Sequence, residues 1–179
     1  NAIVAIEDHR FFNHRGVDFI RIGGAFFSNL RGGRQGGSTL TQQLIKNNVF
    51  PNFVDEKTFY DRLERKIQEQ YLAIAIEKQM SKDEILEAYM NTINLGQGCL
   101  GVQAASMRYF GKDVSQLTLS ECAVIAGITQ NPTKFNPITN PKANAKRRKE
   151  VLDHMLDQNY ISQDEYNNAL NDDVYSRIQ

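Results

Sequence analysis

The stretch Thr58–Met80, with the sequence TFYDRLERKIQEQYLAIAIEKQM, decides the fold class of this chain. Apolar residues recur in it every three or four positions, at Phe59, Leu63, Ile67, Tyr71, Ile74 and Ala75. That period is typical of one face of an α-helix, so the spacing predicts one long helix here. The pattern is helical through nearly all of the remaining chain, without convincing strand alternation or internal repeats. We therefore predict a mostly α fold.

Helix start and stop signals are frequent along the chain. Gly111 suits a helix C-cap, and Pro141 suits the first position of the last long helix. Four capping boxes, each a Ser or Thr followed three residues later by Glu or Gln, predict four helix starts. They are Thr39 with Gln42, Ser81 with Glu84, Thr118 with Glu121, and Ser162 with Glu165.

The composition narrows the possible function classes. A length of 179 residues fits one domain, residues 1–179, with enough chain for a real core. The 21 basic and 21 acidic residues give no net charge, which argues against a nucleic-acid partner. No apolar run has the length of a membrane span. Because the chain starts inside an apolar segment, we expect an anchor helix outside this sequence.

The two cysteines carry little functional information. Cys122 lies in an apolar stretch, where we expect a buried free thiol, and Cys99 lies in a glycine-rich loop. Neither has metal-ligand spacing, and we predict no metal ligands among the site residues.

A cluster of charged residues at Glu7–Gly16, with the sequence EDHRFFNHRG, follows the apolar run from Ala2 to Ile6. The apolar residues fix the backbone, so Glu7 lies where rigid structure meets solvent, which suits a catalytic carboxylate. Repulsion from the neighbouring Asp8 makes Glu7 a better proton acceptor. The alternative interpretation is a polar helix end with Glu7 as an ordinary surface charge.

A second cluster lies within the predicted long helix. Arg65 and Lys66 precede Glu69 by four and three residues, so all three share one helix face. The two cations favour the ionised form of Glu69, which makes it a poor general acid. Together with Lys46, they supply the cationic donors that a diphosphate requires. One base plus several cations fits glycosyl transfer from a diphosphate-linked sugar. The alternative is a surface ladder of salt bridges.

These segments, taken together, resemble five motifs of the peptidoglycan glycosyltransferases, the lipid II polymerases of bacterial cell-wall synthesis. The family includes monofunctional enzymes and the N-terminal domain of class A penicillin-binding proteins. The matching segments, in order, are Glu7–Gly16; Gly37–Gln43 with Lys46 and Asn47; Arg65, Lys66 and Glu69; Tyr89–Asn91 with Gly96, Gly101, Val102 and Tyr109–Lys112; and Leu119–Pro137. The likeness covers nearly the whole chain. Thr129 departs from the usual pattern, in which proline is frequent at this position.

The resemblance implies a lysozyme-like large helical lobe and a smaller membrane-proximal jaw at approximately residues 18–57. Within the jaw, the glycine-rich segment 31–37 and the turn at 50–54 predict mobile loops. It implies that Glu7 is the general base and that Glu69 stabilises the donor diphosphate. The implied substrate-binding residues are Ser38, Gln42, Gln43, Lys46, Arg65, Lys66 and Arg147, and the implied supporting residues are Asp8, Arg10 and His14. No cofactor is required, although a divalent cation, Mg²⁺ or Mn²⁺, could lie near Glu69.

The resemblance also implies the partners and the location. These partners are lipid II, the growing lipid-linked glycan strand, the membrane surface and inhibitors of the moenomycin type, possibly with a C-terminal transpeptidase domain. The implied location is the extracytoplasmic face of the bacterial cell membrane. Two other classes stay open: a hydrolase or lytic transglycosylase that acts on finished glycan, and a non-enzymatic module that docks through its apolar surface, Phe19–Leu30.

Overall fold

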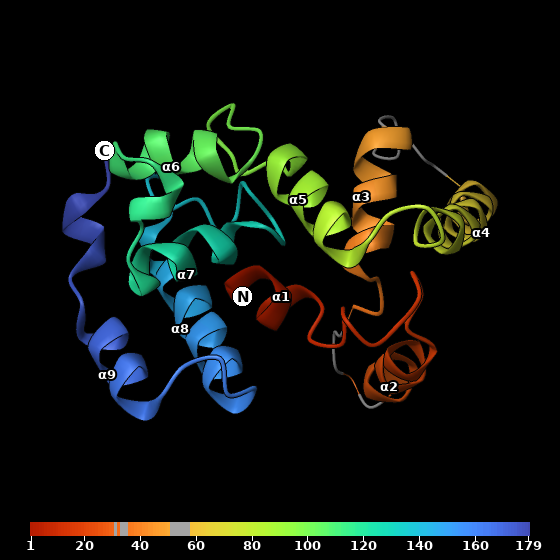
Figure 1. Ribbon diagram of the computed structural model, residues 1–179, viewed down its shortest axis with the longest axis horizontal. Helices are drawn as coiled ribbons and strands as arrows, with labels where there is room; N and C mark the ends of the chain where they lie inside the picture. Colours follow the sequence, from red (N-terminus) through yellow and green to blue (C-terminus); the bar gives the residue numbers. More distant parts are fainter. Residues whose placement is uncertain (31, 33–35, 51–57) are drawn as a thin grey trace. The chain divides into compact units, whose positions relative to one another are not determined.

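The computed structural model describes residues 1–30, 32, 36–50 and 58–179, and this part of the chain is mostly helical (Figure 1). It contains no β-strand, only an isolated bridge between Asn94 and Leu100. The predicted fold class is confirmed. The helices are α1 (Ala2–Glu7), α2 (Phe19–Leu30), α3 (Leu40–Val49), α4 (Phe59–Ile76), α5 (Lys82–Thr92), α6 (Val102–Phe110), α7 (Leu119–Ile128), α8 (Pro141–Asp157) and α9 (Gln163–Asn171), with 3-10 turns η2 (Val114–Gln116) and η3 (Val174–Arg177).

The chain forms two compact units. The first unit contains Asn1–His9 and Met90–Gln179, and the second unit contains Arg10–Tyr89. The predicted jaw, residues 18–57, falls within the second unit, but its identity as a jaw stays a prediction. Most of its expected mobile loops, at residues 31–37 and 50–54, lie outside the described residues. Among the described helices, none is both long enough and apolar enough to cross a membrane.

The core of the first unit is built around α7. This helix is almost completely buried and is apolar after its first turn, and it packs against both α8 and α1. Helix α1 has only six residues and is held by burial of Ile3, Val4 and Ala5. The side chain of Gln158, the C-cap of α8, donates to the Ala5 carbonyl at 2.9 Å. Packing from two neighbours therefore fixes a helix too short to be stable alone.

Local capping sets most helix ends as the sequence predicts. The predicted capping boxes at Thr39, Thr118 and Ser162 begin α3, α7 and α9, and Ser81 exchanges the same hydrogen bonds with Glu84 before α5. A further capping box, of Thr58 with Asp61, begins α4. Gly111 ends α6 in the left-handed conformation, and Pro141 is the first residue of α8. These ends follow from orphan backbone groups that nearby side chains satisfy.

The predicted long helix, α4, ends at Ile76 rather than Met80, because Lys78 and Gln79 bond carbonyls three residues back. Its apolar stripe does not form a core. Phe59 is 67% exposed and Tyr71 72% exposed, whereas the buried residues are Glu69 and Ala73 on another face.

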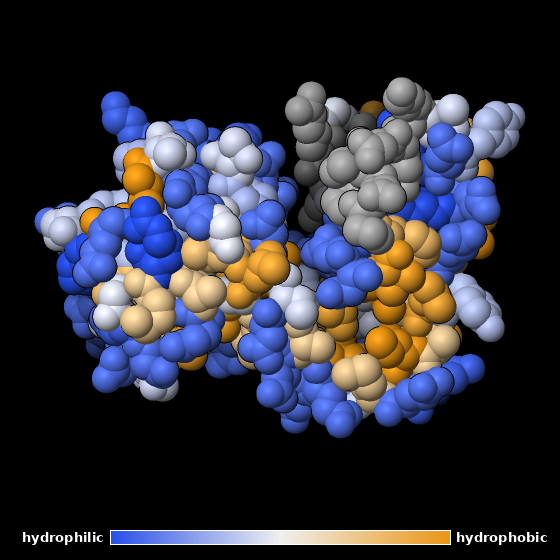
Figure 2. All heavy atoms as spheres, turned by 90° about the horizontal axis from the view of Figure 1, so that it is seen from above, coloured by the Kyte–Doolittle hydropathy of each residue, from blue (hydrophilic) through white to orange (hydrophobic). Residues whose placement is uncertain are grey.

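Large apolar side chains are also exposed on α2. They are Phe19, Ile20, Phe26, Phe27 and Leu30, as expected for the apolar surface of this segment. Figure 2 shows hydrophobic side chains gathered on a face of the second unit. The second unit therefore presents apolar surface from two helices.

The cysteine prediction was wrong in part. Cys122, near the start of α7, is only partly buried. Cys99 is the buried cysteine, since the glycine-rich turn directs its backbone N–H to the Gly96 carbonyl and folds its side chain inward. Burial raises the pKa of both thiols, so neither is activated.

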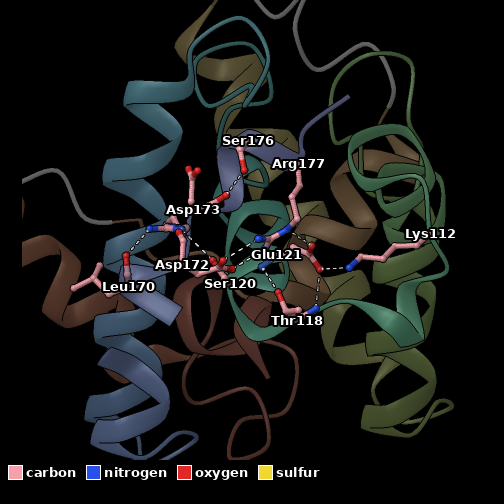
Figure 3. Close-up of polar contacts among 10 residues, drawn as sticks. Lys112, Thr118, Ser120, Glu121, Leu170, Asp172, Asp173, Ser176 and Arg177 are labelled. Carbon is pink, nitrogen blue, oxygen red and sulfur yellow. Dashed lines mark hydrogen bonds and ion pairs between the residues drawn. The ribbon is translucent and has the colours of Figure 1, made fainter. Parts of the chain in front are cut away.

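A buried carboxylate attaches the C-terminal segment to α7 (Figure 3). Glu121 is fully buried and accepts from Lys112 Nζ at 2.7 Å, Arg177 Nε at 3.0 Å and the Thr118 N–H at 2.8 Å. Arg177, in η3, also pairs through two nitrogens with Asp172. Burial raises the pKa of Glu121, but these donors outweigh it and hold the pKa below its usual value.

We predict that Glu121→Gln lowers the free energy of unfolding by about 1–3 kcal/mol at neutral pH, because charge-assisted hydrogen bonds are lost. A depressed pKa contributes stability above the unfolded-state pKa, and this is lost as the pH falls through the folded-state pKa. The difference between variant and wild type therefore shrinks below about pH 4. Urea unfolding across pH measures it. Glu165→Gln, at an exposed capping box, is the matched control and should change little; equal losses in both variants would contradict the assignment.

Candidate functional site

Glu7 is the last residue of α1, at the edge of the first-unit core. The residue is 8% exposed, and its Oε1 accepts a hydrogen bond of 2.7 Å from the Thr129 hydroxyl. Arg147 Nη2 lies 3.9 Å from the same oxygen. A carboxylate that is held on a fixed backbone by a neutral donor is suited to accept a proton.

The predicted late basic residue, Arg147, is brought to Glu7 by α8. Its Nη1 pairs with Glu150 at 2.7 Å, and its guanidinium lies 5.8 Å from the centre of the Phe135 ring. The stem of Arg147 passes close to Gly127 of α7, where an added Cβ would lie 3.3 Å from Arg147 Cγ. The small residue at 127 therefore allows this close approach of α8 to α7.

The second candidate site lies in the second unit around Glu69, which is 1% exposed. Its Oε2 accepts from Arg65 Nη1 at 2.7 Å, and its Oε1 accepts from Lys66 Nζ at 2.6 Å. The prediction that these three residues share one face of a helix is confirmed. The alternative of a surface ladder is wrong, because the carboxylate is buried.

Helix α3 completes the surroundings of Glu69 through its capping box. The Gln42 Oε1 accepts from the Thr39 N–H at 3.0 Å, which directs its Nε2 toward Glu69 Oε1 at 3.3 Å. Glutamate would cap this helix equally well but could not donate to Glu69. Lys66 Nζ also donates to the Ser38 hydroxyl at 2.7 Å. The predicted residues Ser38, Gln42, Arg65 and Lys66 are therefore assembled around one carboxylate.

Two other predicted substrate-binding residues lie farther along α3. The Gln43 Oε1 accepts from the Tyr89 hydroxyl at 3.0 Å, which fixes the amide against α5. Lys46 lies in the last turn of α3 and is partly buried. A cation in this position interacts favourably with the helix dipole.

The predicted supporting residues have structural partners of their own. Asp8 is completely buried and caps α1, and the Arg10 guanidinium pairs with Asp18 at 2.8 Å. Burial raises the pKa of Asp18, but the Arg21 N–H and Arg10 outweigh it and leave that pKa below its ordinary value. His14 is buried and its Nδ1 accepts from the Gly16 N–H at 3.2 Å. Support of Glu7 by these residues stays a prediction.

Gly16, the last residue of the first charged cluster, contacts the backbone of α4. Its φ is +92°, and a Cβ added there would lie 2.5 Å from the Ala73 carbonyl oxygen. Its own carbonyl accepts from the Thr39 hydroxyl at 2.6 Å. The glycine therefore joins the Arg10–Asp18 loop to both helices that surround Glu69.

Sequence reasoning missed Thr129 as the hydrogen-bond partner of Glu7. Its noted departure from the usual pattern was the available signal, but a contact across 122 positions of the chain leaves no local periodicity. Glu150, the partner of Arg147, was also missed, although its i+3 spacing could have identified it.

Residues 1–156 match the family model described as Transglycosylase. The chain belongs to the transglycosylase family. This confirms the predicted family and, with it, the predicted enzyme class, a glycosyltransferase. The chain is 45% identical to penicillin-binding protein 1A of Streptococcus oralis, over 100% of this chain and 28% of that protein. It is 50% identical to penicillin-binding protein 1A of Clostridium botulinum (strain Langeland), over 96% of this chain and 21% of that protein.

A solved structure with a similar sequence and fold is also a penicillin-binding protein 1A. The 2.6 Å crystal structure of penicillin-binding protein 1A from Haemophilus influenzae is similar, with a TM-score of 0.50 and 48% identity. That likeness covers 52% of this chain and 14% of that chain. The chain thus spans about a fifth to just over a quarter of the length of these two curated relatives.

We predict that Gly16→Ala destabilises the protein by at least about 2 kcal/mol, since both the positive φ and the close α4 backbone oppose a side chain. Gly23→Ala is the matched control, because Gly23 lies inside α2 with nothing within 4 Å of the added Cβ. That control should be neutral or more stable by about 0.5–1 kcal/mol. Urea unfolding of the three proteins measures the difference, and equal midpoints for both variants would refute this role of Gly16.

Proposed function

We propose that this chain polymerises lipid II into β-1,4-linked glycan strands. In this mechanism Glu7 removes the proton from the 4-hydroxyl of the acceptor GlcNAc. The resulting oxygen forms a bond to C1 of the donor MurNAc from the face opposite the leaving group, which inverts that carbon. The bond from C1 to the diphosphate oxygen breaks, and undecaprenyl diphosphate leaves. The transferred proton stays on Glu7 until solvent takes it.

The contrast between the two buried carboxylates carries this proposal. Glu69 is paired at 2.6–2.7 Å with two cations, whereas within the first unit Glu7 accepts from a neutral hydroxyl at 2.7 Å and lies 3.9 Å from the Arg147 guanidinium. Two carboxylates in such different environments are suited to different roles. The Thr129 hydroxyl orients the Glu7 carboxylate without adding positive charge, so Glu7 fits the base. Glu69 fits the residue that holds the cationic side chains of Arg65 and Lys66 in place.

The cations around Glu69 support the assignment of the donor site. Arg65 and Lys66 are held by the buried carboxylate, and their side chains are 16% and 36% exposed. Departure of a diphosphate builds negative charge that fixed donors stabilise without reorganisation. We assign this role to Lys46, Arg65 and Lys66, and we assign the walls of the donor groove to Ser38, Gln42 and Gln43.

The proposed mechanism needs no divalent cation. Both oxygens of Glu69 already accept hydrogen bonds from cationic side chains, a donor set that suits an anion rather than a metal. Among the described residues there is also no group of three His, Cys, Asp or Glu side chains placed to hold one. Neutralisation of the diphosphate is assigned to the side chains alone.

We also propose a position at the membrane surface, on the extracytoplasmic face. The exposed apolar side chains of α2 and α4 support it, because a lipid-linked substrate must be met at the bilayer. The proposed partners are lipid II, the growing strand and phosphoglycolipid inhibitors of the moenomycin type. Since the relatives are several times longer, a C-terminal transpeptidase domain in the full-length protein is part of this proposal.

We predict that Glu7→Gln lowers polymerisation of labelled lipid II by at least about a hundredfold, because a general base is removed without a change of shape. Glu87→Gln, an exposed carboxylate on α5, is the control and should keep wild-type activity. Products are separated on a gel. Wild-type turnover by Glu7→Gln would support the non-enzymatic alternative. Release of muropeptides from sacculi, without polymer growth from lipid II, would establish the hydrolase.

For the donor site, we predict that Lys46→Ala raises the apparent KM for lipid II by about tenfold, with a smaller change in kcat. The expected loss corresponds to one charge-assisted contact with the diphosphate. Lys78→Ala, an exposed lysine after α4, is the control. Wild-type kinetics for Lys46→Ala would remove Lys46 from the donor site.

A further inference from the structure

Thr129 occupies a position where one hydroxyl proton faces two acceptors. It is the C-cap of α7 and is almost fully buried. Its Oγ1 lies 2.7 Å from Glu7 Oε1 and 2.8 Å from the Ala126 carbonyl oxygen. A hydroxyl carries a single hydrogen, so it donates to one of the two at a time.

We propose that Thr129 is a positioning residue for Glu7 whose hydroxyl donates to Oε1 while the carboxylate is ionised and turns to the Ala126 carbonyl when the carboxyl takes up a proton. This inference rests on the function proposed above, in which Glu7 is the base. No atom of Thr129 is transferred. The proton from the acceptor sugar resides on Glu7, and the threonine proton only changes its acceptor.

The direction of this exchange follows from hydrogen-bond strength. A donor bonds more strongly to an ionised acceptor than to a neutral one, so the hydroxyl turns to Glu7 before the reaction. Once the carboxyl of Glu7 is protonated, its oxygens are neutral, and the Ala126 amide carbonyl, which is a stronger acceptor than the carbonyl of a carboxylic acid, takes the hydroxyl. The buried hydroxyl therefore has a partner in both states, and neither state carries an unsatisfied donor.

Within the first unit, Arg147 does not replace this hydroxyl. From α8, the Arg147 guanidinium faces Glu7 at 3.9 Å and is bound more closely to Glu150. Its neighbour Arg148 turns to Ser120 instead. Asp8 is next in the chain and carries the same charge as Glu7. From α7, Thr129 approaches Glu7 closely enough for a strong hydrogen bond.

The test compares Thr129→Val, which has the same shape without the hydroxyl, with Thr129→Ser, which keeps the hydroxyl. The carboxyl of Glu7 is titrated by ¹³C NMR in the whole chain labelled at glutamate, with Glu7→Gln identifying its signal. In Thr129→Val we expect the titration midpoint to rise by about one pH unit, because the ionised form loses a donor. In Thr129→Ser it should stay at the wild-type value. If Thr129→Val does not fold, Thr129→Ala provides the second hydroxyl-free variant.

The second readout is the pH profile of kcat/KM with lipid II. The acid limb of this profile should move to higher pH in Thr129→Val, whereas in Thr129→Ser it should stay at the wild-type position. A purely structural role would lower the unfolding midpoint of Thr129→Val without moving the carboxyl titration, and that result overturns the proposal. If the wild-type chain fails to polymerise lipid II, the proposed function fails, whereas the NMR titration still decides whether Thr129 controls the Glu7 carboxyl.

Discussion

Burial of the Glu69 carboxylate is the constraint on which the second unit depends. An ionised carboxylate inside a protein is costly unless charged or polar donors surround it. Arg65 and Lys66 supply them from the same helix, and Gln42 supplies one from α3. Satisfying Glu69 thus fixes α3 against α4 and gathers hydroxyl, amide and cationic groups in one place. The proposed diphosphate site results from the same contacts that make the fold stable.

The first unit also contains two buried carboxylates, and their hydrogen-bond donors differ. Glu121 is bound by two cations and a backbone N–H, so it is fully compensated and serves the structure. Within this unit Glu7 accepts from a neutral hydroxyl, and the Arg147 guanidinium is more distant and shared with Glu150. A carboxylate bound by two cations is held in its ionised form, whereas a neutral hydroxyl orients a carboxylate without adding charge. The proposed division between a structural and a catalytic glutamate therefore follows from the donors rather than from the depth of burial.

Features that depend on neighbouring residues could be predicted from the sequence. Capping boxes, the Gly111 end and the pairing of Arg65 and Lys66 with Glu69 follow from spacings of three or four residues. Contacts between distant segments could not be predicted in this way. The hydrogen bond from Thr129 to Glu7 depends on how helices pack. The same is true of the hydrogen bond from Gln42, a capping residue of α3, to Glu69. The burial of Cys99 similarly depends on a turn built by left-handed glycines.

Helix α4 illustrates why a correct helical period can give a wrong burial assignment. Periodicity identifies an apolar face, but it does not say whether that face meets protein or another apolar medium. In α4 the face with Glu69 and Ala73 is buried, and the face with Phe59 and Tyr71 is exposed. This is the reverse of an ordinary surface helix of a soluble protein, and the exposed side chains of α2 extend the apolar surface of the same unit. Such an arrangement is unfavourable in water and favourable at a lipid surface. The polar cluster inside and the apolar side chains outside both fit a substrate whose charged diphosphate is attached to a membrane lipid.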